Sequence, residues 1–389
     1  MKKLPIAVVV GTRPEAIKMA PVIRELSNSR RLRPVTVSTS QHRHMVDQIL
    51  HSFGIKADHE LRVMRPSQTL WELSGRLATK LGQFLDANAM AAVLVQGDTS
   101  SAFFGGLTGF YHRIPVGHVE AGLRTGNLYA PFPEEMNRTL LGSIATWHFA
   151  PTDQAVHRLL AEGVPRASIH QTGNTVVDAL RWMAPRCGDQ PVKRILGLEL
   201  RDLPLVLVTC HRRESLGAPM RSVAAGLAEL ARRNPRVAIL FPLHPNPAVR
   251  RAVVPKLKGL KNVVLCEPLN YHQFLSCLKH AFLVISDSGG VQEEATALGK
   301  PVLVLREQTE RQEGVKAGAL RLVGTDSAKI LREAECLLNN PRAYARMSQA
   351  SNVFGDGHAA SRIVNIVERA LARREGRSRH SLQRAPTPG

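Results

Sequence analysis

The stretch "IAVVVGTRPEAIK" (6–18) shows the unit from which this chain is built. Five consecutive apolar residues are typical of a strand that is buried on both faces. Gly11 suits a tight turn, and Pro14 stands where the first turn of a helix tolerates proline. The stretch therefore predicts a buried strand followed at once by a helix, as in a parallel α/β sheet.

The same pattern recurs along the chain in two sets of apolar runs that alternate with helical stretches. The runs are IAVVV (6–10), PVTVST (34–39), AAVLVQ (91–96), PVGHV (115–119) and WHFA (147–150), then LVLVT (205–209), VAILF (237–241), NVVLC (262–266), AFLVIS (281–286) and PVLVL (301–305). A Pro- and charge-containing stretch, 183–204, separates the sets and is the expected linker. Since 389 residues exceed the roughly 250–300 at which one core stops growing, we predict an α/β protein of two doubly wound, Rossmann-like domains.

Composition places the chain among soluble globular proteins, because 44% of its residues are hydrophobic and 22% are charged. The five cysteines are scattered without C-x-x-C spacing, which is typical of reduced thiols in a cytosol. No apolar run approaches the ~20 residues of a membrane helix, and the N-terminus lacks a signal-peptide pattern. We therefore expect a cytoplasmic protein that does not associate with membranes.

The net charge of +20 does not by itself indicate nucleic-acid binding. Much of the excess falls in 373–389, which is basic and almost free of apolar residues, so we expect disorder there. The rest is spread along the chain without interleaved aromatic residues, whereas binding to nucleic acid by counterion release needs a clustered basic face. An anionic small substrate accounts for the charge better, and we expect no nucleic-acid partner.

Candidate ligand-binding residues follow the predicted strands at their carboxyl ends, where open parallel sheets bind ligands. They are Arg13, Lys18, Asp98 and Glu120 in the first set and His211, His244, Ser288, Gly289 and Gly290 in the second. A hydroxyl and two glycines at a helix start offer free backbone N–H groups to an anion. Glu294, in the first turn of the same predicted helix, can bind a ribose diol.

A Gly- and Pro-rich stretch, "HVEAGLRTGNLYAPFPEEMNR" (118–138), gathers three acids in a basic chain. A single acid at a strand end is often a helix cap. Asp98 and Glu120 in succession, followed by Glu134 in this loop, favour acid/base chemistry instead.

Several other chemistries lack their sequence motifs. No G-x-G-x-x-G follows a strand, since "FGGLTG" (104–109) lies inside a helical stretch, and Walker A, H-E-x-x-H and G-x-S-x-G patterns are missing. The histidines of "QHRH" (41–44) lack i,i+4 spacing and a third ligand, so we predict no metal and no cofactor. The features that remain are phosphate-binding turns in one half of the chain and carboxylates and cations in the other. This combination suits a nucleotide-diphosphate ligand in an interdomain cleft, with acid/base chemistry on the group that the diphosphate carries.

A series of motifs then carries a family resemblance. In chain order they are "GTRPEAIKMAP", "QGDTSS", "HVEAGLRTGN", "PEEMNR", "TGNTVVDAL", "HRRES", "DSGGVQEEA", "LGKPVLVLRE", "TER", "RLVGTD" and "GDGHAASRI". From about residue 4 to 370 the chain resembles the non-hydrolysing UDP-N-acetylglucosamine 2-epimerases. The resemblance implies a GT-B arrangement, in which two Rossmann-like domains face a cleft, and a homodimer. It implies an N-terminal domain at 1–180 completed by a helix at about 359–374, a UDP-binding domain at 181–358, and a disordered basic tail at 375–389.

The reaction that the resemblance implies interconverts UDP-N-acetylglucosamine and UDP-N-acetylmannosamine. UDP is eliminated to leave a 2-acetamidoglucal and is added back after protonation on the other face. Cleavage of the C1–O bond develops oxocarbenium character, which a carboxylate stabilises, while loss and return of the C2 proton need acid/base groups on both faces. By resemblance Asp98, Glu120 and Glu134 are the catalytic acids, and His211 lies at the diphosphate. Which carboxylate serves which face stays open.

The resemblance also assigns binding residues. Arg13 and Lys18 match nucleotide and active-site cations, Ser288, Gly289 and Gly290 the phosphate turn, Glu294 the ribose acid, Phe274 a ring beside uracil, and Arg138 and Arg311 groups at the sugar or diphosphate. His244, at the end of a predicted strand, is a further candidate for binding the substrate or UDP. Phe274 can equally be plain helix core. Gln41, His42 and Gln68 fit a segment that binds a second UDP-N-acetylglucosamine as activator in many bacterial members, although Ser67 stands where several members have arginine.

The chain departs from the family at four positions without losing an ionisable catalytic group. Cys210 replaces glycine, Ala130 and Phe132 replace serine and tryptophan, and Gln312 replaces proline. The sugar pocket is therefore expected to differ, and a modified UDP-amino sugar stays open as substrate. A hydrolysing 2-epimerase that releases N-acetylmannosamine, a GT-B glycosyltransferase and a sensor without turnover stay open as functions. The product is expected to serve cell-surface polysaccharide or amino-sugar biosynthesis.

Overall fold

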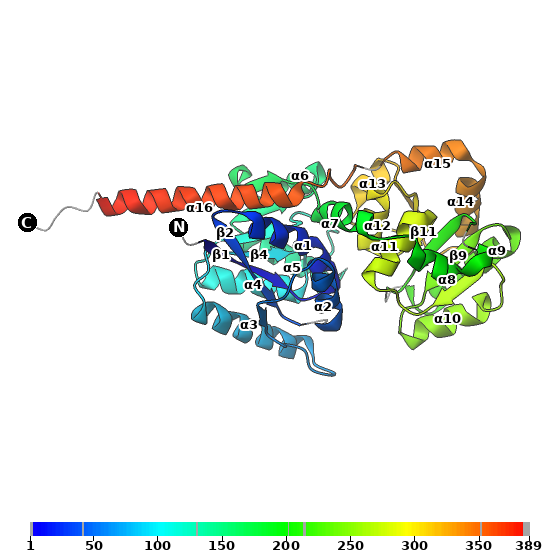
Figure 1. Cartoon of the computed structure of the whole chain (residues 1–389), viewed down its shortest axis with the longest axis horizontal. Coiled ribbons are helices and arrows are strands. Elements are labelled where there is room, and N and C mark those ends of the chain that lie inside the picture. Colours follow the sequence, from blue (N-terminus) through cyan, green and yellow to red (C-terminus); the bar gives the residue numbers. More distant parts are fainter. Residues whose placement is uncertain are drawn as a thin grey trace, which may run out of the picture. The chain divides into compact units, whose positions relative to one another are not determined.

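The computed structural model describes residues 3–40, 43–129, 131–200, 202–212, 215–350 and 352–383, and at 43–44, 198–199 and 376–383 it describes the backbone alone. The chain folds as two compact units, Met1–Ala179 with Gly355–Gly389, and Leu180–Phe354 (Figure 1). Each unit holds one parallel sheet with flanking helices, which confirms the predicted α/β fold of two doubly wound parts. The cleft between them stays a prediction.

The first unit is built on a sheet with the strand order β3-β2-β1-β4-β5-β6-β7. Its strands are β1 (Leu4–Val10), β2 (Leu32–Ser38), β3 (His59–Glu60), β4 (Ala92–Gln96), β5 (Val116–Val119), β6 (Trp147–Ala150) and β7 (Ile169–Gln171). Its helices are α1 (Arg13–Asn28), α2 (Arg43–Ser52), α3 (Leu70–Ala87), α4 (Ser100–Tyr111), α5 (Glu134–Ile144), α6 (Asp153–Ala161), the 3-10 turn η1 (Arg166–Ser168), the start of α7 (Thr175–Met183) and α16 (Ala359–Gln383). All its strand pairs are parallel.

Burial on both faces explains why the central strands of this sheet are continuous apolar runs. Residues 6–10 of β1 and all of β4 are buried. On one face, Leu77, Leu81 and Phe84 of α3 join the core beneath these strands. They repeat at helical spacing, so that one side of α3 packs inward.

Helix α16 returns to the first unit and lies against α1 (Figure 1). Its first turn is held by the buried carboxylate of Asp178, which accepts the N–H groups of Ala359 (3.2 Å) and Ala360 (2.8 Å). Burial raises the pKa of Asp178 above its ordinary value, although these hydrogen bonds oppose the rise. Ile363, Val367 and Leu371, four residues apart, are buried.

Helix α16 continues to Gln383, whereas we expected it to end at about 374 and to be followed by a disordered tail. The expectation of disorder is therefore wrong for 375–383. Leu382 is the one leucine of this stretch, which has few other apolar atoms to bury, but its arginines and glutamate are good helix formers, and no proline occurs before Pro386. The remaining expectation, for 384–389, lies outside the described residues.

The second unit repeats the topology, with the strand order β10-β9-β8-β11-β12-β13. Its strands are β8 (Leu205–Thr209), β9 (Ala238–Pro242), β10 (Val263–Cys266), β11 (Ala281–Ser286), β12 (Val302–Val304) and β13 (Leu320–Leu322). Its helices are the rest of α7, the 3-10 turn η2 (Ala184–Arg186), α8 (Gln190–Leu200), α9 (Ala218–Arg233), α10 (Pro247–Leu257), α11 (Tyr271–His280), α12 (Gly289–Ala297), α13 (Gln312–Lys316), α14 (Ser327–Asn339) and α15 (Pro341–Ser348). All its strand pairs are parallel as well.

The stretch 183–204 is not the linker that we expected, because it folds into the second unit as η2 and α8. Val192 and Leu196 are buried, and α8 packs on α11. Lys279 of α11 donates hydrogen bonds to the carbonyl oxygens of Ala184 (3.1 Å) and Cys187 (2.9 Å). A short helical stripe of apolar residues thus packs inward, although the stretch is rich in charges.

Each sheet reverses its strand order between two neighbours, β1 and β4 in the first unit and β8 and β11 in the second. The loops that leave the carboxyl ends of such a pair run to opposite sides, which opens a crevice where ligands bind. In the first unit these loops begin at Gly11 and Gly97, and in the second at Cys210 and Asp287. The topology thus brings together predicted site residues that are far apart in sequence.

Candidate active site

Glu15 joins the two loops at the reversal point of the first sheet. Its carboxylate accepts the backbone N–H groups of Gly11 (3.0 Å) and Thr12 (2.6 Å) after β1, and the Thr99 hydroxyl (2.5 Å) after β4. Burial raises the pKa of Glu15 to about 7, although the hydrogen bonds from these loops lower it. The sequence did not single out Glu15, because the residue that it contacts, Thr99, is 84 residues away.

Glu120 follows β5 and is the most constrained of the predicted catalytic acids. Its carboxylate Oε2 accepts hydrogen bonds from the Lys18 ammonium and from Nδ2 of Asn174 (3.2 Å). The three residues are 4% (Lys18), 8% (Glu120) and 3% (Asn174) exposed. The backbone of Glu120 has φ +65°, in the left-handed region that costs a non-glycine residue about 1–3 kcal/mol. Such strain is concentrated at functional sites, and here it directs a carboxylate toward a buried cation.

Asp98 lies in the loop after β4 and is paired with Arg138 of α5. The guanidinium of Arg138 donates to Oδ2 of Asp98 and lies 3.2 Å from Glu135, while Asn137 donates to the Asp98 carbonyl oxygen (2.9 Å). The Asp98 side chain keeps 28% of its surface exposed, whereas Arg138 is buried. Asp98 is therefore held in place and still accessible to a ligand.

The adjacent acids Glu134 and Glu135 have different environments at the start of α5. Glu135 is buried and accepts the N–H groups of Thr125 (2.8 Å) and Gly126 (3.0 Å), so that it fixes the preceding loop. Glu134 is half-buried in the first turn of the helix, where the positive end of the helix dipole favours a carboxylate. The geometry makes Glu135 structural and leaves Glu134 the better candidate for chemistry.

His118 of β5 is a further positioning group that the sequence did not single out. Its Nε2 lies 2.8 Å from the carbonyl oxygen of Gly97, so Nε2 carries the proton and donates it. Burial lowers the pKa of His118 to about 3, with a smaller contribution from His148 on the neighbouring strand. His118 is therefore neutral at physiological pH and fixes the loop that carries Asp98.

In the second unit, a buried acid shapes the loop that carries His211. Oδ2 of Asp287, fully buried at the end of β11, accepts the N–H groups of His211 (2.7 Å) and Arg212 (2.8 Å). Oδ1 lies 3.4 Å from Nδ1 of His211. His244 stacks on His211 with 5.5 Å between ring centroids, and burial together with the His211 charge lowers the pKa of His244. The two predicted histidines therefore adjoin, and the His211 side chain is 41% exposed.

The predicted phosphate turn forms the start of α12. Ser288 precedes the helix without a side-chain hydrogen bond to it, so its hydroxyl does not cap the helix. The N–H groups of Gly289 and Gly290 open the first turn, which is the geometry that binds phosphate elsewhere. A Cβ at Gly289 would lie 2.8 Å from the Arg311 guanidinium, so this cation packs closely against the glycine and would have to shift to admit a larger residue.

Arg311 is held by acids of its own unit. Its guanidinium lies 2.8 Å from Glu293 and 3.3 Å from Glu310. Burial would raise the pKa of Glu310, but Arg311, Arg306 and Arg212 outweigh it and hold that pKa well below its usual range. The network fixes the start of α12, and a direct role of Arg311 at a ligand stays a prediction.

Glu294 and Phe274, which the resemblance assigns to the nucleoside, both lie among buried groups. Glu294 accepts a hydrogen bond from the Tyr271 hydroxyl (3.1 Å), which the sequence did not predict. Phe274 is buried on α11. Their contacts to ribose and uracil stay predictions, as does that of Arg13, the half-buried first residue of α1.

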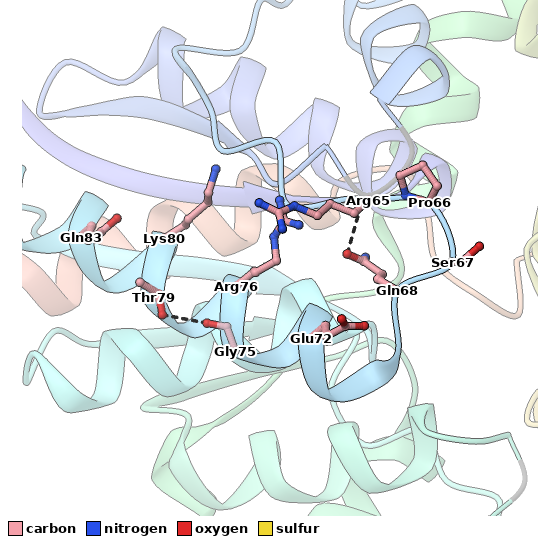
Figure 2. Close-up of a pocket in the computed structure, with 10 residues that line it drawn as sticks. All are labelled: Arg65, Pro66, Ser67, Gln68, Glu72, Gly75, Arg76, Thr79, Lys80 and Gln83. Atoms are coloured by element: carbon pink, nitrogen blue, oxygen red, sulfur yellow. Dashed lines mark hydrogen bonds between the residues drawn. The ribbon is translucent and has the colours of Figure 1, made fainter.

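Gln68 lines a pocket of about 660 Å³ beside α3 (Figure 2). Its Oε1 accepts the backbone N–H of Arg65 (3.0 Å), which closes the loop before α3. Arg65, Arg76 and Lys80 give the pocket a basic lining. Gln41 and His42, the other residues of the predicted activator segment, lie outside the described residues.

The described part of the chain contains no group of three or more His, Cys, Asp or Glu side chains arranged to hold a metal ion. Within the same residues no helix is both long and apolar enough to cross a membrane.

The chain is a Rossmann-type α/β protein, because each unit holds a doubly wound parallel sheet. Carboxylates paired with cations lie at the reversal point of the first sheet, and a helix start with open N–H groups lies at that of the second, which suits phosphate-bearing ligands. The family model for UDP-N-acetylglucosamine 2-epimerase matches residues 24–368. The chain belongs to the UDP-N-acetylglucosamine 2-epimerase family, which confirms the resemblance drawn from its motifs.

Individual relatives agree with the family assignment. The UDP-N-acetylglucosamine 2-epimerase of Yersinia pestis is 46% identical over 366 residues, covering 92% of this chain and 97% of the relative. That of Bacillus subtilis is 46% identical over 364 residues, covering 94% and 95%. The crystal structure of UDP-GlcNAc 2-epimerase from Neisseria meningitidis bound to UDP-GlcNAc has a TM-score of 0.89 at 41% identity, covering 94% of this chain and 100% of that one.

Proposed function

We propose that this chain is a non-hydrolysing 2-epimerase that interconverts UDP-N-acetylglucosamine and UDP-N-acetylmannosamine. The observation that carries the proposal is the grouping of carboxylates and cations at the reversal point of the first sheet. Lys18 pairs with Glu120 there, and Arg138 pairs with Asp98. The Neisseria meningitidis relative bound to UDP-GlcNAc supports a UDP-sugar as the substrate.

In the proposed reaction the C1–O bond breaks and its electron pair leaves with the β-phosphate of UDP. A carboxylate removes the C2 proton, and a C1=C2 double bond forms in the 2-acetamidoglucal. An acid on the opposite face then protonates C2 while UDP adds back to C1, so that atoms and charge balance. Asp98, Glu120 and Glu134 are the groups proposed for this work, and Lys18 balances charge beside them.

The second unit is proposed to hold the leaving group. The N–H groups at the start of α12 and the hydroxyl of Ser288 suit the diphosphate, whose negative charge grows as the C1–O bond breaks. His211 is proposed to act at the same diphosphate, because its ring is partly exposed and anchored by Asp287. Glu294 suits the ribose hydroxyls. These assignments make the first unit act on the sugar and the second on the nucleotide.

Proton NMR of the pure protein with UDP-N-acetylglucosamine in D2O tests the proposal directly. UDP-N-acetylmannosamine should appear with deuterium at C2, because the proton passes through exchangeable acids. Epimerisation with full retention of the C2 proton would contradict the elimination mechanism. Free N-acetylmannosamine with UDP would indicate the hydrolysing reaction. Turnover that needs an added acceptor would indicate a glycosyltransferase, and binding without turnover would indicate a sensor. Substrate competition with modified UDP-amino sugars tests whether one of them is the preferred substrate.

We further propose a cytoplasmic homodimer that uses a second UDP-N-acetylglucosamine as activator, on the strength of the family resemblance. The pocket that Gln68 lines is basic, which suits a diphosphate. Sigmoidal dependence of the rate on substrate that becomes hyperbolic in Gln68→Ala would support the activator, and an unchanged hyperbolic curve in both would contradict it. Sedimentation velocity tests the dimer.

A further inference from the structure

We propose that Asn174 is a positioning residue for Glu120, whose side-chain amide fixes the orientation of that carboxylate toward the substrate. The inference rests on the proposed function, in which Glu120 acts on the sugar. Asn174 lies after β7, 54 residues beyond Glu120 in the sequence. No motif in the sequence assigned it a role.

The hydrogen bonds of Asn174 determine which way its amide faces. Oδ1 of Asn174 accepts the N–H of Val176 (3.0 Å) at the start of α7, as the first residue before a helix commonly does. Since an amide has one oxygen acceptor, Nδ2 must point the other way, and it lies 3.2 Å from Oε2 of Glu120. The helix start therefore holds the amide in the rotamer that donates to Glu120.

Lys18 and Asn174, which both donate to Glu120, differ in charge. Lys18 supplies a cation to Oε2, and Asn174 supplies a neutral donor to the same oxygen. A buried carboxylate requires such partners, because burial without them is costly. The cation balances charge, whereas the amide adds direction without adding charge. Both donors act on Oε2, so they hold that oxygen of the carboxylate from two parts of the chain, Lys18 of α1 and Asn174 before α7.

Asn174 also lies where the chain passes between its two compact units. The helix that it precedes, α7, contains the first passage, at Ala179 and Leu180. Gly355 follows the second passage, and a Cβ there would lie 3.2 Å from the backbone N of Asn174. The backbone at Gly355 therefore packs closely against that of Asn174, next to the residue that contacts Glu120.

The variant that isolates the amide is Asn174→Ser. Serine can still accept the N–H of Val176 and start α7, but it is too short to reach Glu120. We expect kcat to fall about 10- to 100-fold, the scale for misplacement of a reacting group, while UDP affinity by isothermal titration stays unchanged. The matched control is Asn262→Ser in the second unit, which removes a buried amide that donates to the carbonyl oxygens of Ala231, Asn234 and Val237 (2.9–3.1 Å). It should lower the melting temperature and leave turnover per folded molecule unchanged.

A double-variant cycle separates positioning from general loss of structure. In Glu120→Gln the group to be positioned is already lost, so adding Asn174→Ser should change kcat by less than roughly two-fold. Adding Asn262→Ser should leave the kcat per folded molecule unchanged in either background. Additive losses of turnover for Asn174→Ser and Glu120→Gln would overturn the positioning role. So would normal kcat in Asn174→Ser. If Glu120→Gln itself kept full turnover, the proposed function of Glu120 would fail instead, and the two failures are thereby distinguished.

Discussion

Glu15→Gln tests the buried carboxylate that joins the two loops of the first sheet. Glutamine keeps the size of the side chain, and its single oxygen can accept the N–H groups of Gly11 and Thr12 as Glu15 does now. Its amide nitrogen would face the hydroxyl of Thr99, which can turn from donor to acceptor. The fold and turnover should therefore survive, whereas Glu15→Ala should lose both.

The magnitude follows from the pKa of about 7 in the folded protein against 4.5 for an ordinary glutamate. At ~1.4 kcal/mol for each pH unit, this difference amounts to about 3 kcal/mol. Below pH 4.5 both states are protonated and the contribution to stability is fully present. Between pH 4.5 and 7 the unfolded chain loses the proton while the folded one keeps it, so the free energy of unfolding falls as pH rises. Above pH 7 the loss is complete.

Urea unfolding at intervals from pH 4.5 to 8.5, followed by tryptophan fluorescence, measures the effect, since Trp147 is buried in the first unit. The neutral glutamine variant should match the parent at the acidic end and become more stable than it by up to about 3 kcal/mol at pH 8. Subtracting the two curves removes the titration of all other groups. Parallel curves would refute the reasoning, because they would mean that the pKa of Glu15 is the same in both states.

Three further predictions concern catalysis, cofactors and the tail. Glu120→Gln and Glu134→Gln should lower turnover by roughly 10²–10⁴ with UDP affinity little changed. Ser288→Ala should instead weaken UDP binding by roughly 1.5–3 kcal/mol. If the glutamine variants lost UDP binding as much as turnover, the segment 118–138 would bind the nucleotide and its glutamates would not be catalytic. Activity should persist after exhaustive dialysis against chelator, and a strict need for added NAD or divalent metal would contradict this. Deleting 376–389 should leave melting temperature and turnover nearly unchanged in calorimetry and the NMR assay, because the segment has little apolar surface to bury, and a large loss of either would show that it docks.

The apolar pattern predicted the central strands well and the edge strands poorly. Runs such as 6–10 and 205–209 are buried on both faces and therefore continuous in sequence. The strands β3, β7 and β13 are two or three residues long at sheet edges, so they carry no run that a pattern can detect. The stretch 183–204 was misread for a related reason. Gly197, at φ +75°, interrupts a helix too short for its apolar stripe to stand out from its charges.

For the site, the sequence singles out candidate acids and cations but not the residues that hold them in place. Acids and cations at strand ends are visible because strands and turns are local features of a sequence. Glu135 resembles its neighbour Glu134 in every local respect, and only the fold distinguishes them, by directing Glu135 inward onto the N–H groups of Thr125 and Gly126. Residues such as Asn174 and His118 act through contacts to other loops, and no local pattern reports such contacts.

The strand order of the first sheet explains why these supporting residues cannot be found from spacing. The loops after β1 and β4 meet because β4 pairs with β1, although β2 and β3 lie between them in sequence. That single pairing brings Glu15 to Thr99, and the next, β4 with β5, extends the same edge to Glu120. A one-residue change of register along β5 would turn Glu120 to the other face of the sheet, away from Lys18. The contacts of Glu120 with Lys18 and Asn174 therefore depend on the register of β5 as well as on residue identity.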